Sequence, residues 1–247
     1  STHRHTLFPY TTLFRSLVKT GRLSEARIDE SVRRLLRLKF QLGLFDNPFV
    51  DENLVPQVLG NPASLAAGHA AQERAMTLLK NDGQALPLKG SPRIFVKNID
   101  PGVAARYAEV VSTPDQADFA ILRLETPWVP IDNGVPFAMD FHHGDLDFKG
   151  QAKEEILALC NQVPTIVAIY LDRPAVIPEI SAAAKALIGE YGADDAAVLN
   201  VIFGKARPEG KLPFELPRSM EAVYKQKEDL PHDSENPLYP FGFGLTY

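Results

Sequence analysis

The stretch Asp118-Phe119-Ala120-Ile121-Leu122-Arg123-Leu124 decides the fold, because it is the clearest strand in the chain. A short, mostly apolar run with a polar start is typical of a strand that is covered on both faces of a parallel sheet. The strand runs into Glu125 and then meets Pro127 and Pro130, which exclude further pairing or a helix. We therefore predict a central strand whose carboxyl end continues into a long loop, over residues 125–147.

Strand and helix patterns alternate on both sides of this segment. The sequence predicts strands at 93–99, 165–171, 186–190 and 212–216, and helices near 101–109, 151–162, 176–184 and 194–203. Alternation of this kind predicts a mainly parallel sheet sandwiched between helices, a flavodoxin-like three-layer arrangement with right-handed crossovers. A short strand and a tight turn are expected at 77–83, before the alternation starts.

The loop after the central strand holds the candidate site. It contains the only tryptophan, Trp128, the adjacent pair His142 and His143, and the acidic residues Asp132 and Asp145. Ligands of open α/β sheets bind outside the carboxyl ends of the strands, and loops on a rigid scaffold concentrate binding groups. The alternative is a solvated crossover loop without a function of its own.

Composition and charge exclude several classes of protein. The chain has 247 residues, of which 45% are hydrophobic, and a net charge of −5 without a basic stripe, so we expect no nucleic-acid or membrane-surface partner. No apolar run approaches the ~20 residues of a membrane helix. The single cysteine, Cys160, lies in an apolar helical pattern and is expected to be a small buried side chain.

The motifs of cofactor and metal sites are missing or incomplete. No G-x-G-x-x-G motif follows a strand. Residues 204–211 resemble a phosphate loop, but they have five residues between the glycines instead of four, and one of these is a proline. Leu212 stands where a phosphate loop has the Ser or Thr that binds magnesium. The sequence has no G-x-S-x-G elbow, and His142 and His143 lack the i, i+4 spacing of a zinc site. We therefore expect no nucleotide, cofactor or metal.

The beginning of the chain is expected to be foreign to the fold. Residues 1–5 have no period, and residues 6–16 resemble the translated frame of a widely used sequencing adapter. We therefore set residues 1–16 apart and expect that residues upstream of Leu17 are missing. An amphipathic helix is predicted over 25–42, with Ser24 as its N-cap and Gly43 at its end. Residues 44–51 have the composition of a linker, and Pro62 begins a second helix.

Four blocks of sequence resemble glycoside hydrolase family 3. They contain Leu-Gly-Leu-Phe-Asp within 24–48, Leu-Leu-Lys-Asn-Asp-Gly within 73–88, Arg-Pro-Glu-Gly-Lys-Leu-Pro within 201–218 and Tyr-Pro-Phe-Gly-Phe-Gly-Leu-Thr-Tyr at 239–247. The first resembles the end of the family's catalytic (β/α)8 barrel and the others its α/β sandwich domain. The resemblance thus divides the chain into 1–16, an end of the barrel with a linker at 17–58, and the sandwich domain at 59–247.

The resemblance implies a fragment of a retaining β-glucosidase-type enzyme that acts on a β-linked glycoside. Such an enzyme needs two carboxyl groups about 5–5.5 Å apart, one ionised as the nucleophile and one protonated as the acid. The family's aspartate nucleophile belongs to the barrel, which this chain lacks, so we expect the chain alone to be inactive. The compartment is left open, although the family includes periplasmic and secreted enzymes.

The acid/base is harder to assign, because His143 stands where the family commonly has a glutamate. We prefer Glu125, since it lies beside Trp128, whose apolar face could raise the pKa of a neighbouring carboxyl group and stack on a sugar. Asp132 and Asp145 are rivals, and the acid could also come from the barrel. Trp128, Asp132, His142, His143 and Asp145 are the predicted substrate-binding residues. A stand-alone, noncatalytic ligand-binding or regulatory module is the alternative function.

Overall fold

The structure is a computed structural model that describes residues 10–131 and 141–247. The chain divides between Asn61 and Pro62 into two compact units. Each unit is described by itself below.

The first unit consists of helices. They are α1 (Tyr10–Lys19), α2 (Glu25–Gln41), a 3₁₀ helix (Glu52–Leu54) and α3 (Val55–Val58). The Ser24 hydroxyl accepts a hydrogen bond from the Arg27 amide at 3.3 Å, so α2 begins where the capping pattern predicts. Helix α1 was not predicted, because it begins inside the segment that the sequence analysis set apart. Residues 52–58 likewise form helical turns in a region expected to be a linker.

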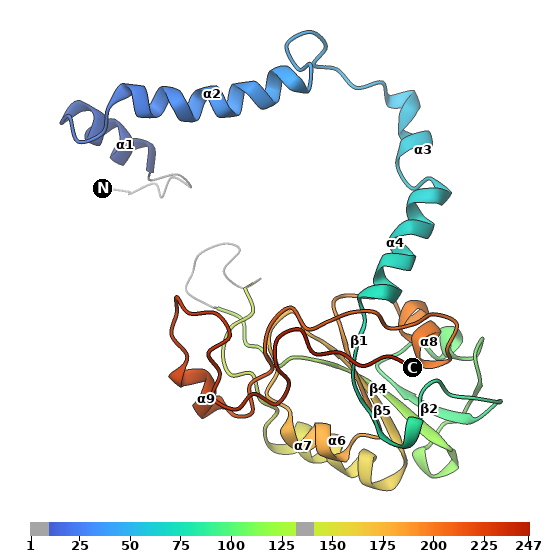
Figure 1. The fold of residues 1–247 in the computed structure, drawn as a ribbon. Coiled ribbons are helices and arrows are strands. Elements are labelled where there is room, and N and C mark those ends of the chain that lie inside the picture. The colour runs from blue at the N-terminus through green and yellow to red at the C-terminus, as the bar shows by residue number, and fades with distance from the viewer. Residues whose placement is uncertain (1–9, 132–140) are drawn as a thin grey trace, which may run out of the picture. The chain divides into compact units, whose positions relative to one another are not determined.

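The second unit is built on a six-stranded sheet, drawn in Figure 1. Helix α4 (Pro62–Ala75) leads into β1 (Thr77–Asn81), and the other strands are β2 (Arg93–Lys97), β3 (Glu109–Val110), β4 (Phe119–Glu125), β5 (Thr165–Tyr170) and β6 (Ala186–Glu190). The strand order is β1-β6-β5-β4-β2-β3. Among the strands of the described residues, only β1 is antiparallel to its neighbour, and the other pairs are parallel. The predicted mainly parallel α/β sandwich is confirmed.

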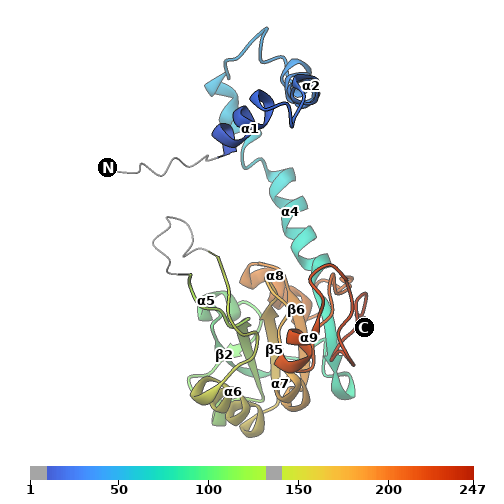
Figure 2. The same cartoon turned by 90° about the vertical axis from the view of Figure 1, so that its left-hand side faces the viewer.

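Helices cover both faces of the sheet (Figures 1 and 2). Helices α6 (Gly150–Gln162) and α7 (Pro178–Ala183) pack on one face, and α5 (Pro101–Ala104) and α8 (Asp195–Ile202) pack on the other. The alternation of side chains along β4 explains the two cores, because Ile121 belongs to the core under α8 while Leu122 and Leu124 belong to the core under α6 and α7. Hence residues 121, 123 and 125 of β4 share the α8 face.

Two predicted elements are wrong. The segment 212–216 is not a strand, since Pro213 and Pro217 have no N–H to donate and the buried Leu212 and Leu216 bond instead to the C-terminal segment. The Leu216 amide donates to the Tyr239 carbonyl at 2.9 Å. The helix expected over 101–109 ends at Ala104, and residues 109–110 form the short edge strand β3. Helix α9 (Met220–Lys225) was not predicted.

In the described ranges, no helix is both long enough and apolar enough to traverse a bilayer.

Helix α2 carries an apolar stripe that suggests a test. No residue of α2 is buried in the described structure, and Leu35 and Leu42, at its C-terminal half and cap, are 66% and 63% exposed. Apolar side chains that gather on one exposed face favour association. We expect the chain to self-associate as its concentration rises, and Leu35→Gln combined with Leu42→Gln to weaken this association in sedimentation experiments.

The matched control is Arg33→Gln, which changes an exposed side chain of the same helix without touching the apolar residues. It should associate like the unchanged chain. A strict monomer at high concentration would contradict the prediction.

Candidate active site

Glu125 is the last residue of β4 and lies at the carboxyl edge of the sheet. It pairs with Tyr170 of β5, and its side chain is exposed. Next to it, a pocket of about 430 Å³ is lined by Asn98, Arg123, Leu124, Glu125 and Tyr170. The chain continues from β2 outward to β3 and then returns past β2 to β4, so the winding direction changes between β2 and β4. The pocket therefore lies at the topological switch point, where open α/β sheets bind ligands.

Trp128 contacts Glu125 through the edge of its ring. The indole Nε1–H donates a hydrogen bond to Glu125 Oε1 at 3.1 Å. The face of the indole is stacked on His142, with ring centroids 3.9 Å apart and planes inclined by 10°. The expectation that the apolar face of Trp128 lies against Glu125 is therefore wrong. Instead, the tryptophan holds the carboxylate by a polar contact and offers its face to another ring.

The two stems of the loop are fastened to each other and to the sheet. Val129 and His143 exchange backbone hydrogen bonds of 2.9 and 3.3 Å. The Arg173 guanidinium donates to the Pro127 carbonyl at 3.1 Å and to the His143 carbonyl at 2.9 Å. Gly144 has φ +87°, and a Cβ there would lie 2.8 Å from Val129 Cγ2, so the close approach of the stems requires glycine. The stems that carry Trp128 and His142 are thus held in place.

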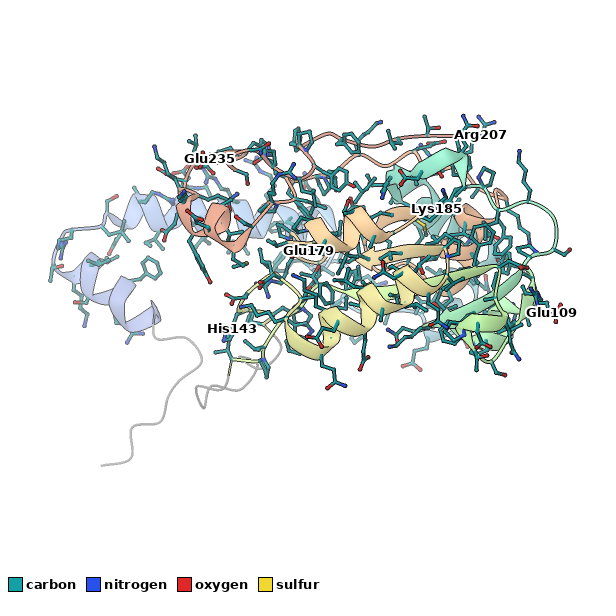
Figure 3. The ribbon with its side chains drawn as sticks, turned by 90° about the horizontal axis from the view of Figure 1, so that it is seen from below. Glu109, His143, Glu179, Lys185, Arg207 and Glu235 are labelled. Atoms are coloured by element: carbon teal, nitrogen blue, oxygen red, sulfur yellow. The ribbon has the colours of Figure 1, made fainter. Side chains whose placement is uncertain are left out.

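The predicted substrate-binding residues have different surroundings. His142 Nδ1 contacts Asp172 Oδ2, and His143 Nδ1 is buried with no hydrogen-bond partner in the described part of the chain. His143 lies at the opposite end of the sheet from Glu109 and Lys185, as Figure 3 shows. Trp128 is in direct contact with both Glu125 and His142. Asp132 lies outside the described residues.

Asp145 is held as a carboxylate. It contacts the Lys149 ammonium and accepts a hydrogen bond from the Tyr224 hydroxyl at 2.7 Å. The hydrogen bond from Lys149, and then that from Tyr224, lowers the pKa of Asp145 below its ordinary value. A carboxyl group with a lowered pKa is ionised at neutral pH, which suits a binding group better than a proton donor. Asp145 and Trp128 also line a second, shallow pocket of about 620 Å³ in front of the first turn of α6.

A buried ion pair at the same edge was missed by the sequence analysis. The Glu190 carboxylate is fully buried and accepts from Arg123 Nη2 at 3.0 Å and from the amides of Gly192 and Ala193 at 2.7 and 2.9 Å. Arg123 Nη1 also donates to Asp195 at 2.8 Å. Burial of Arg123 acts to lower its pKa, but the ion pairs with Glu190 and Asp195 outweigh it, so the pKa of Arg123 is raised. The signal that could have revealed this pair is a charged residue in an otherwise apolar strand. Arg123 is such a residue in β4, and Glu190 is such a residue in β6.

Two further residues, Asp172 and Arg173, were also missed. They follow β5 and lie more than 25 residues from the loop residues that they contact. In the described residues, no group of three or more His, Cys, Asp or Glu side chains is placed to hold a metal ion. Glu125 and Trp128 offer the chemistry of a carboxyl group beside an aromatic side chain.

The ion pair of Arg123 and Glu190 leads to a stability prediction. Arg123→Met leaves the buried Glu190 carboxylate without its cation, and breaking a buried pair in this way costs about 3–5 kcal/mol. We expect the free energy of unfolding, measured with urea, to fall by about that amount.

The control is Arg93→Met, which removes an exposed arginine that pairs with Asp118 on the surface. An exposed pair of this kind adds little to stability, so Arg93→Met should unfold at nearly the same urea concentration as the unchanged chain. Equal stabilities of Arg123→Met and Arg93→Met would show that the buried pair does not hold this edge of the sheet.

Comparison with known proteins adds a family to this geometry. Residues 104–247 match the model of the glycosyl hydrolase family 3 C-terminal domain. The chain is 48% identical over 235 residues to beta-glucosidase C of Emericella nidulans, and this alignment covers 94% of the chain and 38% of the relative. The chain is 37% identical over 237 residues to the periplasmic beta-glucosidase/beta-xylosidase of Dickeya chrysanthemi, and this alignment covers 93% of the chain and 36% of the relative.

Solved structures with low sequence identity share the fold. The β-glucosidase of Listeria innocua in complex with glucose is 21% identical, with a TM-score of 0.68 over 95% of this chain and 40% of that one. The β-glucosidase of Erythrobacter marinus is 20% identical, with a TM-score of 0.72, and the match covers 95% of this chain and 42% of that one. The chain thus spans less than half the length of these curated relatives and solved structures.

Proposed function

Since the chain belongs to glycosyl hydrolase family 3, with residues 104–247 matching its C-terminal domain, we propose that it supplies the acid/base half of a retaining β-glycosidase site. In this proposal residues 59–247 are the sandwich domain, residues 17–58 continue from an upstream (β/α)8 barrel, and residues 1–16 are foreign to the enzyme. The barrel supplies the nucleophile and most of the sugar pocket. The substrate is a β-linked glycoside.

Glu125 is the proposed general acid/base. The observation that carries this assignment is its position at the carboxyl end of β4, exposed at the switch-point pocket and contacted by the single tryptophan. As an acid, Glu125 protonates the glycosidic oxygen while the nucleophile attacks the anomeric carbon. As a base, it then takes a proton from the water that releases the glycosyl-enzyme. The lowered pKa of Asp145 makes that residue the weaker candidate for the protonated role.

Trp128, His142, His143, Asp145 and Asp132 are the proposed substrate-binding residues. An aromatic surface packs against the apolar face of a sugar ring, and carboxylates and imidazoles bond to its hydroxyl groups. The pocket of about 620 Å³ beside Trp128 and Asp145 has this mixture of apolar and charged lining. It supports the proposal that the leaving group of the substrate lies on this side of Glu125.

The role of Glu125 is tested in a longer protein, in which the N-terminal part of the Emericella nidulans relative precedes Leu17. Glu125→Gln removes the proton donor, so we expect kcat/KM on an alkyl β-glucoside, a poor leaving group, to fall about 10²- to 10⁴-fold. The loss of kcat/KM on a nitrophenyl β-glucoside should be much smaller, because that leaving group needs little protonation. The kcat on the nitrophenyl substrate should fall because release of the glycosyl-enzyme has lost its base, and added azide should restore it, since azide attacks the glycosyl-enzyme without a base.

Two rivals and one control accompany this variant. Asp145→Asn and Asp132→Asn should lose rate on both substrates alike, as expected when binding or orientation is damaged. Glu154→Gln, an exposed glutamate of α6, should behave like the unchanged protein. If Asp145→Asn or Asp132→Asn shows the leaving-group dependence, the assignment moves to that residue. If none of the variants shows it, the acid comes from the barrel or the domain is a noncatalytic module.

A second prediction concerns the chain as it stands. Without the nucleophile there is no group to form the glycosyl-enzyme, and without the sugar pocket little substrate is bound. We expect the chain alone to hydrolyse a nitrophenyl β-glucoside no faster than its Glu125→Gln variant. Turnover by the chain that the Glu125→Gln change abolishes would contradict the proposed division of the site.

A further inference from the structure

Asp172 is in contact with His142, and the proposed function gives Asp172 no role. Asp172 follows β5, and its side chain is 17% exposed, while the His142 side chain is 28% exposed. The contact joins Asp172 Oδ2 to His142 Nδ1. An ionised carboxylate can only accept a hydrogen bond, so Nδ1 must carry the proton, and this fixes both the tautomer and the plane of the imidazole.

The fixed imidazole determines the position of Trp128. The two rings are stacked almost parallel, with centroids 3.9 Å apart and planes inclined by 10°. The indole Nε1–H in turn donates to Glu125 Oε1 at 3.1 Å. Because a hydrogen bond depends on the direction of its N–H, any rotation of the indole on the imidazole changes the contact with Glu125. Four side chains from three segments are therefore linked in series.

Asp172 is the charged residue that contacts His142 directly. The neighbouring Arg173 guanidinium is instead engaged with backbone carbonyls of the loop stems. The orientation of the imidazole therefore depends on Asp172.

We propose that Asp172 is a positioning residue that acts through His142 and Trp128 to hold the Glu125 carboxyl group in one orientation. The proposal rests on the acid/base role of Glu125 given above. A carboxyl group that must deliver its proton along one direction loses rate when its orientation is lost, and a misplacement of about 1 Å can cost about 100-fold. Asp172 itself touches neither the reacting bond nor the substrate in this account.

Trp128 provides the readout, because it is the only tryptophan in the chain. A ring stacked on the face of an indole shields it from a dissolved quencher such as acrylamide. We expect acrylamide to quench the tryptophan fluorescence of His142→Gln more strongly than that of the unchanged chain, because the stack on Trp128 is lost. Asp172→Asn should change the quenching in the same direction, because the contact that orients the imidazole is weakened.

His143→Gln is the matched control, since it removes the adjacent histidine, whose ring is not the one stacked on Trp128. It should keep the quenching of the unchanged chain, and Asp172→Glu should restore the quenching towards that of the unchanged chain. Circular dichroism and thermal melting identify any variant that fails to fold, and Asp172→Glu then carries the test. Quenching that His142→Gln or Asp172→Asn leaves unchanged overturns the proposal.

The kinetic arm uses the longer protein described above. Asp172→Asn should lower kcat on the alkyl glucoside by about 10- to 100-fold and shift the alkaline limb of its pH profile, which reports loss of the proton from the general acid, with KM little changed. Asp172→Glu should recover part of the rate. If Glu125→Gln shows the leaving-group dependence while Asp172→Asn has an unchanged rate and pH profile, the positioning role fails alone. If Glu125→Gln lacks that dependence, the proposed function fails, whatever the fluorescence shows.

Discussion

The fully buried carboxylate of Glu190 is the constraint on which the carboxyl edge of the sheet depends. A buried charge is tolerated only when it is paired and hydrogen-bonded, and Glu190 meets this requirement through Arg123 and two backbone amides. The network continues from Arg123 to Asp195 of α8, which in turn accepts from the amide of Asp100 at 2.9 Å. One ion pair therefore ties β4 to β6, to α8 and to the start of α5. Glu125 follows Arg123 by two residues on the same face of the strand, so the rigidity of this network is passed directly to the candidate acid.

The two stems of the loop are held by contacts with residues at and just after the end of β5. Thr126 is fully buried, and its hydroxyl donates to the carbonyls of Tyr170 and Arg173 at 3.0 and 3.2 Å. The Arg173 side chain donates to carbonyls on both stems of the loop, and Asp172 contacts His142. The segment immediately after β5 thus fastens the loop at several points, which explains how a long connection presents Trp128 and His142 in a defined arrangement. This arrangement is what a site on a loop needs if it is to meet a second domain with its groups already oriented.

The sequence correctly predicted several elements that are determined by the local pattern of residues. The apolar run that ends at Glu125 predicts β4, and the Ser24 cap with its apolar spacing predicts α2. Local pattern failed at 212–216, where alternation resembles a strand but prolines remove donors and the bonding partner is the distant Tyr239. The same distinction between local and distant contacts holds for the candidate site. Glu125 and Trp128 lie close together in the sequence and could be predicted. The edge contact between them and the contacts of Asp172 and Arg173 depend on segments that only folding brings together.

The most direct test of the central claim is a crystal structure of the longer, barrel-containing protein with a β-linked disaccharide bound and the barrel nucleophile replaced by alanine. We expect the Glu125 carboxyl group to lie within about 2.6–3.2 Å of the glycosidic oxygen. We also expect Glu125 to lie about 5–5.5 Å from the position that the nucleophile's carboxyl group occupies in the unchanged protein, the separation of a retaining pair. A different carboxyl group on the glycosidic oxygen, with Glu125 directed away from the sugar, would show that Glu125 is not the acid.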